Sequence, residues 1–534
     1  MAIEQLRRIG LACAISVSAV GAATAQVAPP GPPSGGIRGA EPAGDFTPGL
    51  NVPASRDVTP GPRSGPVLSF GIRNRLLLSD NIDLEPPGDE RDGFILEVSP
   101  TLRAEINRPR LQAELDYTLR NFYTRPDVGY EGPQHEVRGL GNMALKDDWL
   151  WLAGQALVHE VNTSPFDPSS ADPGSRVGNR TGYRRFDVSP YVRGRLGAQT
   201  TYLAGYAFNA VRYSGDQPNS TAHRVHGQVV RDPSLRRFGY EISADGSRRD
   251  FDGGGDFETT NARLLGLYRP GRTLTIGAGA DYTRINVVTS DSGETGGWGP
   301  VVFMGWRPTP RTELTLLAVD AYYGNYGTAT LSHRTGNWHL DVRYEQGIID
   351  GSEGGLVYAG GRTGFDPGQP ADPANPVSEG LGDLGTLPGF GTPLATGLLG
   401  TALVDQRRLT ATLGWLRQRN SAALTLFTSR NEAVQTNVPL PGSIVGLDDL
   451  EQHGAILRYD RRISLQTTGT LQGAFTRSEA QSGALESDLV VLDAILSRSF
   501  SRHIIMSIGY RWTEQSGTTE YRENAVIATL DYRF

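Results

Sequence analysis

The stretch GFILEVSPTLRAEINRPRLQAELDYTLRNFY, residues 93–123, alternates apolar and polar side chains over two long runs. Ile95 is the one apolar residue on the polar parity of the first run, and residues 107–110 form the turn between the runs. A period of two predicts β-strands, because successive side chains of a strand point to opposite faces. Each run is longer than the usual globular strand, and it is long enough to cross a bilayer at a tilt.

The same alternation recurs to the end of the chain, for example over residues 273–282, 338–345 and 504–513. The last ten residues, AVIATLDYRF, alternate as well, with Ile527 as the exception, and they end on Phe534. A final aromatic residue on an alternating strand resembles the signal that outer-membrane barrels present to their insertion machinery. We therefore expect Tyr532 and Phe534 to act as the membrane-insertion signal.

The connections between the predicted strands differ in length. Short ones include 108–109, 232–234, 269–271 and 308–310, whereas long polar ones include 79–92, 162–181, 288–297, 347–404 and 432–449. This organisation predicts an all-β, transmembrane, antiparallel up-and-down β-barrel of 18–22 strands, with short periplasmic turns and long outer loops. A soluble sandwich is the alternative, but its strands would be about half as long.

Tryptophans beside short connections support the membrane interpretation. They are expected to form an aromatic girdle at the periplasmic interface. The five are Trp149, Trp151, Trp306, Trp338 and Trp415.

The N-terminus predicts export from the cytoplasm. Residues 1–25 combine the basic pair Arg7 and Arg8, an apolar stretch over 9–21 and the small residues Ala23-Thr24-Ala25, as in a signal peptide cleaved before Gln26. Residues 26–66 contain ten Pro and eight Gly, which predicts a disordered periplasmic leader. The barrel is then expected over 67–534, in the outer membrane of a Gram-negative cell.

The composition of the 534 residues excludes several classes of protein. Outside the N-terminus the chain has no run of 18 apolar residues, which excludes a helical membrane protein. The net charge of −7 gives no reason to expect nucleic acid as a partner. The single cysteine, Cys13, lies in the predicted signal, so neither a disulfide framework nor a thiolate metal site is expected.

Polar residues of the alternating strands are predicted to line a water-filled lumen, because Arg facing mid-bilayer lipid would cost about 2–4 kcal/mol. The candidates are Glu97, Arg103, Glu105, Glu114, Asp116, Arg120, Asp281, Asp341, Arg343, Glu345, Arg511, Asp531 and Arg533. Each of them could instead pair across strands and stiffen the wall. Their mixed charge favours hydrophilic solutes, without a strong preference for cations or anions.

A barrel of about 22 strands is wide enough to need a plug or an infolded loop, unless it passes something large. Segment 347–404, with 58 residues that include 15 Gly and six Pro, is the predicted gate or constriction; a solvated surface loop is the alternative.

No catalytic site, cofactor site or metal site is expected. Gly-x-Ser-x-Gly, His-Glu-x-x-His and phosphate-loop motifs are absent from the sequence, and His223 and His226 lack a third ligand nearby. A barrel-borne hydrolase could still combine Ser and His from separate strands. The basic residues are 50 Arg and one Lys, which suits phosphate groups of lipopolysaccharide or acidic polysaccharide but also follows from a GC-rich coding bias.

Several stretches resemble a known family. These are SDNI (79–82), SPTLR (99–103), LDYTLRNFY (115–123), DWLWLAGQALV (148–158) and NRTGYRRFDVSPYVRGRLGAQTTYLAGYAFNAVRYS (179–214). They are similar to the outer-membrane barrels associated with PEP-CTERM and exopolysaccharide loci, in the β-barrel porin type 2 grouping. The resemblance spans most of 67–534, assigns no catalytic residues, and leaves 347–404 as an insertion. It implies an outer-membrane component that forms the exit pore for a secreted polysaccharide.

The leading hypothesis is therefore a non-enzymatic outer-membrane pore associated with exopolysaccharide secretion. The alternatives are a general porin for small hydrophilic solutes, a barrel-borne hydrolase and a structural barrel. The expected partners are outer-membrane lipid and lipopolysaccharide, the barrel insertion machinery, polysaccharide and periplasmic export components.

Overall fold

The computed structural model describes residues 66–108, 110–125, 132–147, 149–170, 172–175, 178–197, 199–215, 217–233, 237–252, 256–287, 295–350, 355–356, 397–398, 403–433, 450–480 and 483–534. The predicted signal peptide, the predicted leader and most of segment 347–404 lie outside these ranges. No helix long and apolar enough to cross a membrane occurs among the described residues.

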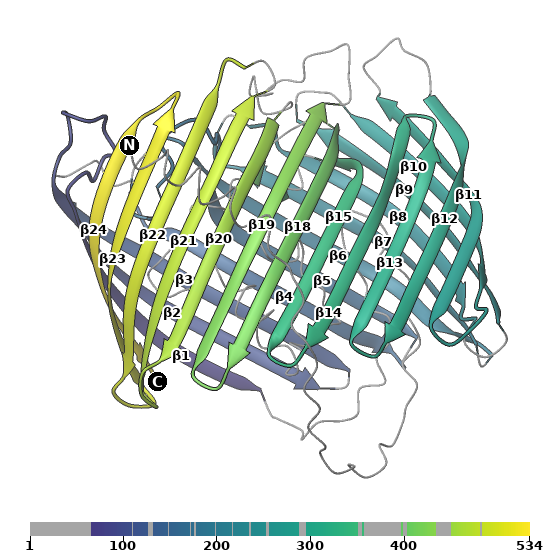
Figure 1. Cartoon of the computed structure of the whole chain (residues 1–534), viewed down its shortest axis with the longest axis horizontal. Helices are drawn as coiled ribbons and strands as arrows, with labels where there is room; N and C mark the ends of the chain where they lie inside the picture. Colours follow the sequence, from purple (N-terminus) through teal and green to yellow (C-terminus); the bar gives the residue numbers. More distant parts are fainter. Residues whose placement is uncertain are drawn as a thin grey trace, which may run out of the picture. The chain divides into compact units, whose positions relative to one another are not determined.

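One sheet of 22 strands makes up the fold, and each strand pairs antiparallel with the next along the chain (Figure 1). The first half consists of β1 (Val67–Ser79), β2 (Gly93–Arg108), β3 (Leu111–Arg125), β4 (Gln134–Lys146), β5 (Leu150–Asn162), β6 (Arg180–Leu196), β7 (Thr200–Tyr213), β8 (Ser220–Arg231), β9 (Phe238–Phe251), β10 (Phe257–Tyr268) and β11 (Leu274–Val287). The second half consists of β12 (Thr295–Thr309), β13 (Thr312–Ala321), β14 (Gly324–Thr335), β15 (Trp338–Asp350), β18 (Leu403–Arg417), β19 (Asn420–Ala433), β20 (Leu450–Arg462), β21 (Thr467–Ala480), β22 (Glu486–Ser499), β23 (Ile504–Gly517) and β24 (Tyr521–Arg533).

The first and last strands close the sheet. β24 pairs antiparallel with β1, from Gly71↔Arg533 to Ser79↔Ala525, so no free edge remains in the 22-stranded sheet. The protein is therefore a closed antiparallel barrel, which confirms the predicted fold class at the upper end of the predicted strand range. The short strands β16 (Gly355–Leu356) and β17 (Gly397–Leu398) pair only with each other.

The two ends of the barrel differ in their connections. At the end where β24 finishes, ten turns of two to six residues join β2 to β3, β4 to β5 and so on to β22 and β23 (Figure 1). We call this the turn end. The opposite loop end carries every longer connection, among them 80–92, 163–179 and 434–449. The connection expected over 347–404 is shorter than predicted, because β15 and β18 pair as far as Asp350↔Leu403.

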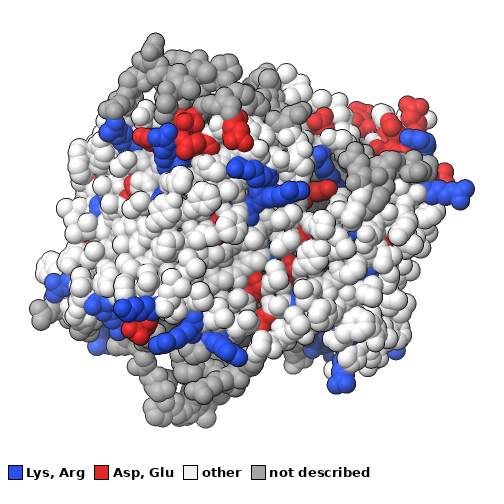
Figure 2. All heavy atoms as spheres, turned by 180° about the vertical axis from the view of Figure 1, so that it is seen from behind, with Lys and Arg blue, Asp and Glu red and all other residues white. Residues whose placement is uncertain are grey.

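Alternation assigns the side chains of each strand to two faces. In β1, Leu76 and Leu78 are 37% and 48% exposed, whereas Arg75, on the opposite parity, is 1% exposed. Apolar residues of the same kind cover the outside of the other strands, so the outer surface is a largely uncharged band between charged rims (Figure 2). Polar and charged side chains face inward.

The prediction of an aromatic girdle is wrong for one residue, Trp151. Trp151 faces the interior, where it is 6% exposed and stacks on Tyr191 with ring centroids 6.3 Å apart. It lies inside because it shares the inward parity of β5 with Ala153, which is 1% exposed. Trp149, by contrast, precedes β5 in a turn and is 42% exposed.

Candidate functional site

The connection between β5 and β6, residues 163–179, is called the inner loop, because its described residues fold into the barrel. Phe166 and Asp172 in this loop are 3% and 1% exposed, which an outward-projecting loop would not allow. Asn179 ties its two ends together: its Oδ1 accepts from the Ser164 amide at 2.7 Å, and its Nδ2 donates to the Ser164 carbonyl at 2.7 Å. The inner loop therefore has a defined conformation at its base.

The far side of the inner loop binds strands β23 and β24. Gln515 Oε1 accepts a hydrogen bond from the Ser169 amide at 3.2 Å, and Tyr521 Oη donates to the Ser169 carbonyl at 2.7 Å. The strands β1 to β4 separate β24 from β5 along the wall. The inner loop thus crosses part of the lumen, from the β5–β6 wall to the β23–β24 wall.

A buried charge network anchors the middle of the loop. Arg75 of β1 forms an ion pair with Asp172 of the inner loop and with Glu97 of β2, the latter at 3.1 Å. Glu97 also accepts from Arg120 at 3.1 Å and from the Ser99 hydroxyl at 2.6 Å. Such charges must pair, because an uncompensated charge in this water-excluded position would be strongly unfavourable.

Close packing at Gly174 completes this contact. A Cβ atom at Gly174 would lie 2.8 Å from Ile95 Cγ2 and 2.8 Å from Phe122 Cδ1, so only glycine allows the loop to approach the wall this closely. Phe166 packs at the other end, in a buried cluster with Leu450 and Ala480.

The two residues that break the alternation in the sequence lie together here. Ile95 and Ile527 face inward and belong to one buried apolar cluster, which we call the mouth cluster. Its members are Leu77, Ile82, Ile95, Phe122, Ile495, Ala525 and Ile527. Ile82 comes from the 80–92 loop, so this second loop also folds inward over the wall. The exceptions in the pattern are therefore contacts between the wall and the infolded loops.

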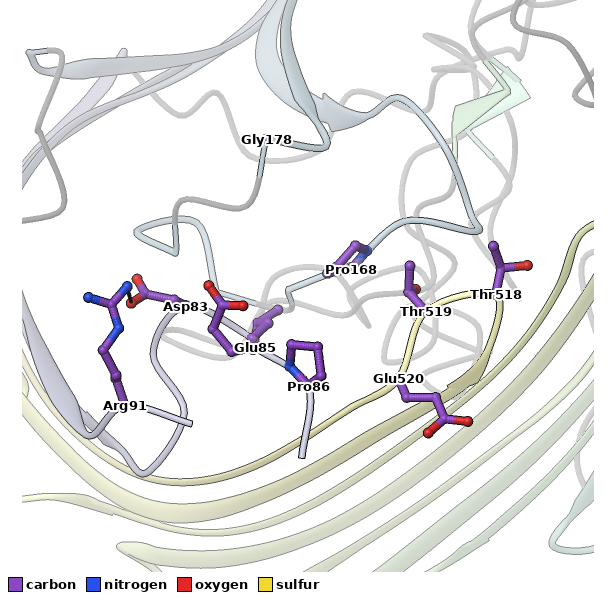
Figure 3. A pocket seen from close by; sticks show the side chains of 10 residues that line it. Asp83, Glu85, Pro86, Arg91, Pro168, Gly178, Thr518, Thr519 and Glu520 are labelled. Atoms are coloured by element: carbon purple, nitrogen blue, oxygen red, sulfur yellow. Dashed lines mark ion pairs between the residues drawn. The ribbon is translucent and has the colours of Figure 1, made fainter. Parts of the chain in front are cut away.

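A cavity of about 540 Å³ opens at the loop end where these loops meet. It is lined by Asp83, Leu84, Glu85, Pro86 and Arg91 of the 80–92 loop, Pro168 and Gly178 of the inner loop, and Thr518, Thr519 and Glu520 between β23 and β24 (Figure 3). We call it the vestibule. Arg91 pairs with Asp83 at 2.7 Å, which leaves the carboxylates of Glu85 and Glu520 in excess. The vestibule is therefore acidic.

All thirteen residues predicted to line the lumen lie on the inward parity of their strands. They differ in what they contact. Glu97 and Arg120 belong to the network under the inner loop, Arg511 pairs with buried Asp493 at 3.0 Å, and Asp531 pairs with Arg73 at 2.8 Å.

The other predicted lumen residues are mostly paired as well. Asp281 is buried against Arg263 at 3.0 Å and accepts from Tyr326 at 2.7 Å. Arg103 pairs with Glu114 at 3.0 Å and lies 3.8 Å from Asp116, Arg343 pairs with Glu345, and Asp341 contacts His339. Glu105 and Arg533 are exposed near the turn end. Pairing is thus the dominant arrangement of the thirteen residues: eight pair across strands, whereas Asp341, Arg343 and Glu345 pair within β15.

Sequence reasoning missed the residues that position the inner loop. Arg75 has the parity of a lumen residue and could have been found by extending the alternation into β1. Asp172, Gly174 and Asn179 could not, because a loop has no period and their partners are distant in the chain. The predicted gate, 347–404, lies almost wholly outside the described residues, except for its ends in β15 and β18 and the pair β16–β17.

No protein-family model and no curated protein matches the sequence. Solved structures do match the fold. The FrpB iron transporter of Neisseria meningitidis (F5-1 variant) aligns with a TM-score of 0.52 and 8% identity, over 87% of this chain and 82% of that one. The siderophore receptor PiuA of Acinetobacter baumannii has a TM-score of 0.46 and 7% identity, over 87% and 82%. Ferric citrate transporter FecA has 0.47 and 11%, over 87% and 78%. At these identities the likeness to FrpB shows the barrel fold alone.

Proposed function

We propose that this chain is a non-enzymatic outer-membrane barrel through which hydrophilic material crosses, past a constriction made by the inner loop. Four observations support the proposal. The sheet is closed, its outer face is an apolar band, and its inner face is polar and charged. FrpB, which shares the fold, is a transporter by its description.

The proposed constriction is inferred from the position of the inner loop. It crosses from the β5–β6 wall to β23–β24 and is held by the buried pair Arg75–Asp172. Solutes that enter at the loop end would meet the acidic vestibule first and the inner loop next.

Two kinds of cargo are candidates. Exopolysaccharide, leaving as a polymer, is the cargo implied by the family resemblance of residues 79–214. Passage of a chain polymer would require the inner loop to move aside. Small hydrophilic solutes are the second candidate. The contacts that hold the inner loop are buried, and a fixed constriction would admit only small molecules.

A reducible cross-link that locks the inner loop distinguishes the two. The Ser169 amide lies 3.2 Å from Gln515 Oε1 on β23, so in the variant Ser169→Cys/Gln515→Cys a short bis-methanethiosulfonate reagent can join the two thiols through disulfides. Apart from Cys13, in the predicted signal, the chain has no other cysteine to interfere. Conductance in planar bilayers and liposome swelling with sugars of increasing size would be measured before and after reduction.

The pore proposal predicts ion conductance in both states. Small-solute transport predicts the same size cut-off in both states, whereas polymer export predicts that reduction admits longer oligosaccharides. A folded barrel that conducts no ions in either state, and also after removal of residues 357–396, would overturn the pore itself.

A further inference from the structure

The turn end carries an unusual excess of basic residues. Every one of the ten turns has an Arg or Lys within two residues. They are Arg108, Arg110, Lys146, Arg195, Arg231, Arg236, Arg237, Arg269, Arg272, Arg311, Arg334, Arg417, Arg419, Arg461, Arg462, Arg498 and Arg502. The acidic residues in the same windows are Asp147, Asp148, Asp232 and Glu313. At the loop end, by contrast, residues 80–92 contain six acidic residues and one Arg.

Two of these arginines lie on the outer face, directly beyond an aromatic ring. Trp415 and Arg417 share the outward parity of β18, and Tyr459 and Arg461 share that of β20. Residues two apart on a strand point the same way and lie about 6–7 Å apart along it. Each arginine is therefore one step further from the middle of the barrel wall than its aromatic neighbour.

An outward arginine and an aromatic ring also meet at the β22–β23 turn, here with the ring beyond the arginine. Phe500 is 54% exposed, and the Arg498 guanidinium carbon lies 5.2 Å from the centre of its ring. The blue row along the lower rim in Figure 2, below the white band, shows the basic residues of this end gathered at one level.

The order of the aromatic ring and the arginine in β18 and β20 matches the chemistry of a phospholipid interface. Aromatic rings favour the headgroup level, where one edge is apolar and the other is wet. An arginine one step beyond can extend its apolar stem along the wall and present its guanidinium fork to a phosphodiester, which it binds through two hydrogen bonds. A surface with an excess of such groups attracts anionic lipid.

We propose that these turn-end arginines form a basic rim that binds the phosphate groups of anionic phospholipids in the surrounding leaflet. The outward members defined here are Arg417, Arg461 and Arg498. A phospholipid shell is the partner that fits best because basic residues occur at all ten turns around a closed wall, whereas a protein partner would contact one sector. The inference rests on the proposed membrane location, but not on pore activity.

Lipid selectivity tests the basic rim. The folded protein would be placed in vesicles of phosphatidylcholine mixed with either brominated phosphatidylglycerol or brominated phosphatidylcholine. Bromine quenches nearby tryptophan fluorescence, and the exposed Trp306 and Trp338 report from the outer face. The ratio of quenching gives the preference for the anionic lipid.

A matched pair of triple variants isolates the outward residues. Arg417→Gln/Arg461→Gln/Arg498→Gln removes three outward charges, and Arg195→Gln/Arg334→Gln/Arg462→Gln removes three turn-end charges of inward parity. The wild type is expected to prefer phosphatidylglycerol by about fivefold, the outward variant to lose most of this preference, and the inward variant to keep it.

Equal effects of the two triple variants, or no preference in the wild type, would overturn the proposal. Heat-modifiable migration on gels verifies that each variant is folded. Because quenching is measured without any solute flow, a failure of lipid selectivity is distinguishable from a failure of the pore.

Discussion

Arg75 of β1 and Asp172 of the inner loop form an ion pair inside the barrel, although they are 97 residues apart in the chain. Their side chains are 0% and 1% exposed. The same strand β1 pairs with β24 to close the sheet. The position of the inner loop and the closure of the barrel therefore depend on one strand.

Removal of the Arg75 charge tests this link. We expect Arg75→Gln to lower the free energy of unfolding by about 3–5 kcal/mol, because Asp172 is left as an uncompensated buried charge and Glu97 keeps only Arg120 as its cationic partner. Thermal unfolding, followed by heat-modifiable migration and circular dichroism, measures the loss. Arg103→Gln is the control. Arg103 of β2 pairs with Glu114 of β3 but is 57% exposed, so this variant should lose no more than about 1 kcal/mol of unfolding free energy. Equal losses would contradict the role given to Arg75.

Gly174 tests whether the loop needs its close approach to the wall. We expect Gly174→Val to displace the inner loop and raise single-channel conductance, because the new side chain would overlap Ile95 and Phe122. Gly178→Val is the matched control, since a Cβ at Gly178 meets nothing within 4 Å. If both variants conduct like the wild type, the loop does not set the constriction.

The mouth cluster predicts opposite behaviour for two adjacent residues of β24. Ile527 is 0% exposed inside the barrel, whereas Val526 is 43% exposed on the outer face. We expect Ile527→Ala to cost about 2–5 kcal/mol through lost burial and the cavity left behind. Val526→Ala should cost less, since its side chain leaves no enclosed cavity. Urea unfolding in lipid vesicles measures both, and a larger loss for Val526→Ala would show that the faces are assigned wrongly.

The vestibule predicts a mild preference for cations. Arg91 pairs with Asp83, so Glu85 and Glu520 give the lining an excess of negative charge. The double variant Glu85→Gln/Glu520→Gln should therefore shift the reversal potential in a salt gradient toward that of a non-selective pore. The shift should shrink as salt rises from 0.1 to 1 M, because the charges are then screened over about 3 Å rather than about 10 Å. Glu90→Gln, in the same loop but outside the lining, should leave the potential unchanged.

The barrel itself could be predicted from the sequence because alternation is a local property. Residues 93–123 already assign Leu96 to one face and Glu97 to the other, and the structure keeps both assignments. The predicted strand number was also close, since each hairpin leaves its own turn. Trp151 is an exception, because its position beside a short connection predicts a girdle residue whereas its parity in β5 places it inside.

The inner loop could not be predicted in the same way. Its contacts join Asp172 to β1 and Ser169 to β23, at separations of 97 and 346 residues, and no periodicity connects such positions. A hint was present nevertheless: Ile95 and Ile527 are apolar on a polar face, and an apolar residue facing a lumen requires something to cover it. The longest segment, 347–404, is the natural candidate for a gate, whereas the loop that the structure shows folded inward is the shorter inner loop.

Single-channel conductance of the folded protein tests the central claim most directly, namely a pore narrowed by the inner loop. The wild type would be compared in planar bilayers with a variant in which residues 165–177 are replaced by a short Gly-Ser linker. Both are expected to conduct, and the shortened variant is expected to conduct more and to admit larger sugars. Equal conductance in the two proteins, or no conductance in either while both migrate as folded barrels, would contradict the account.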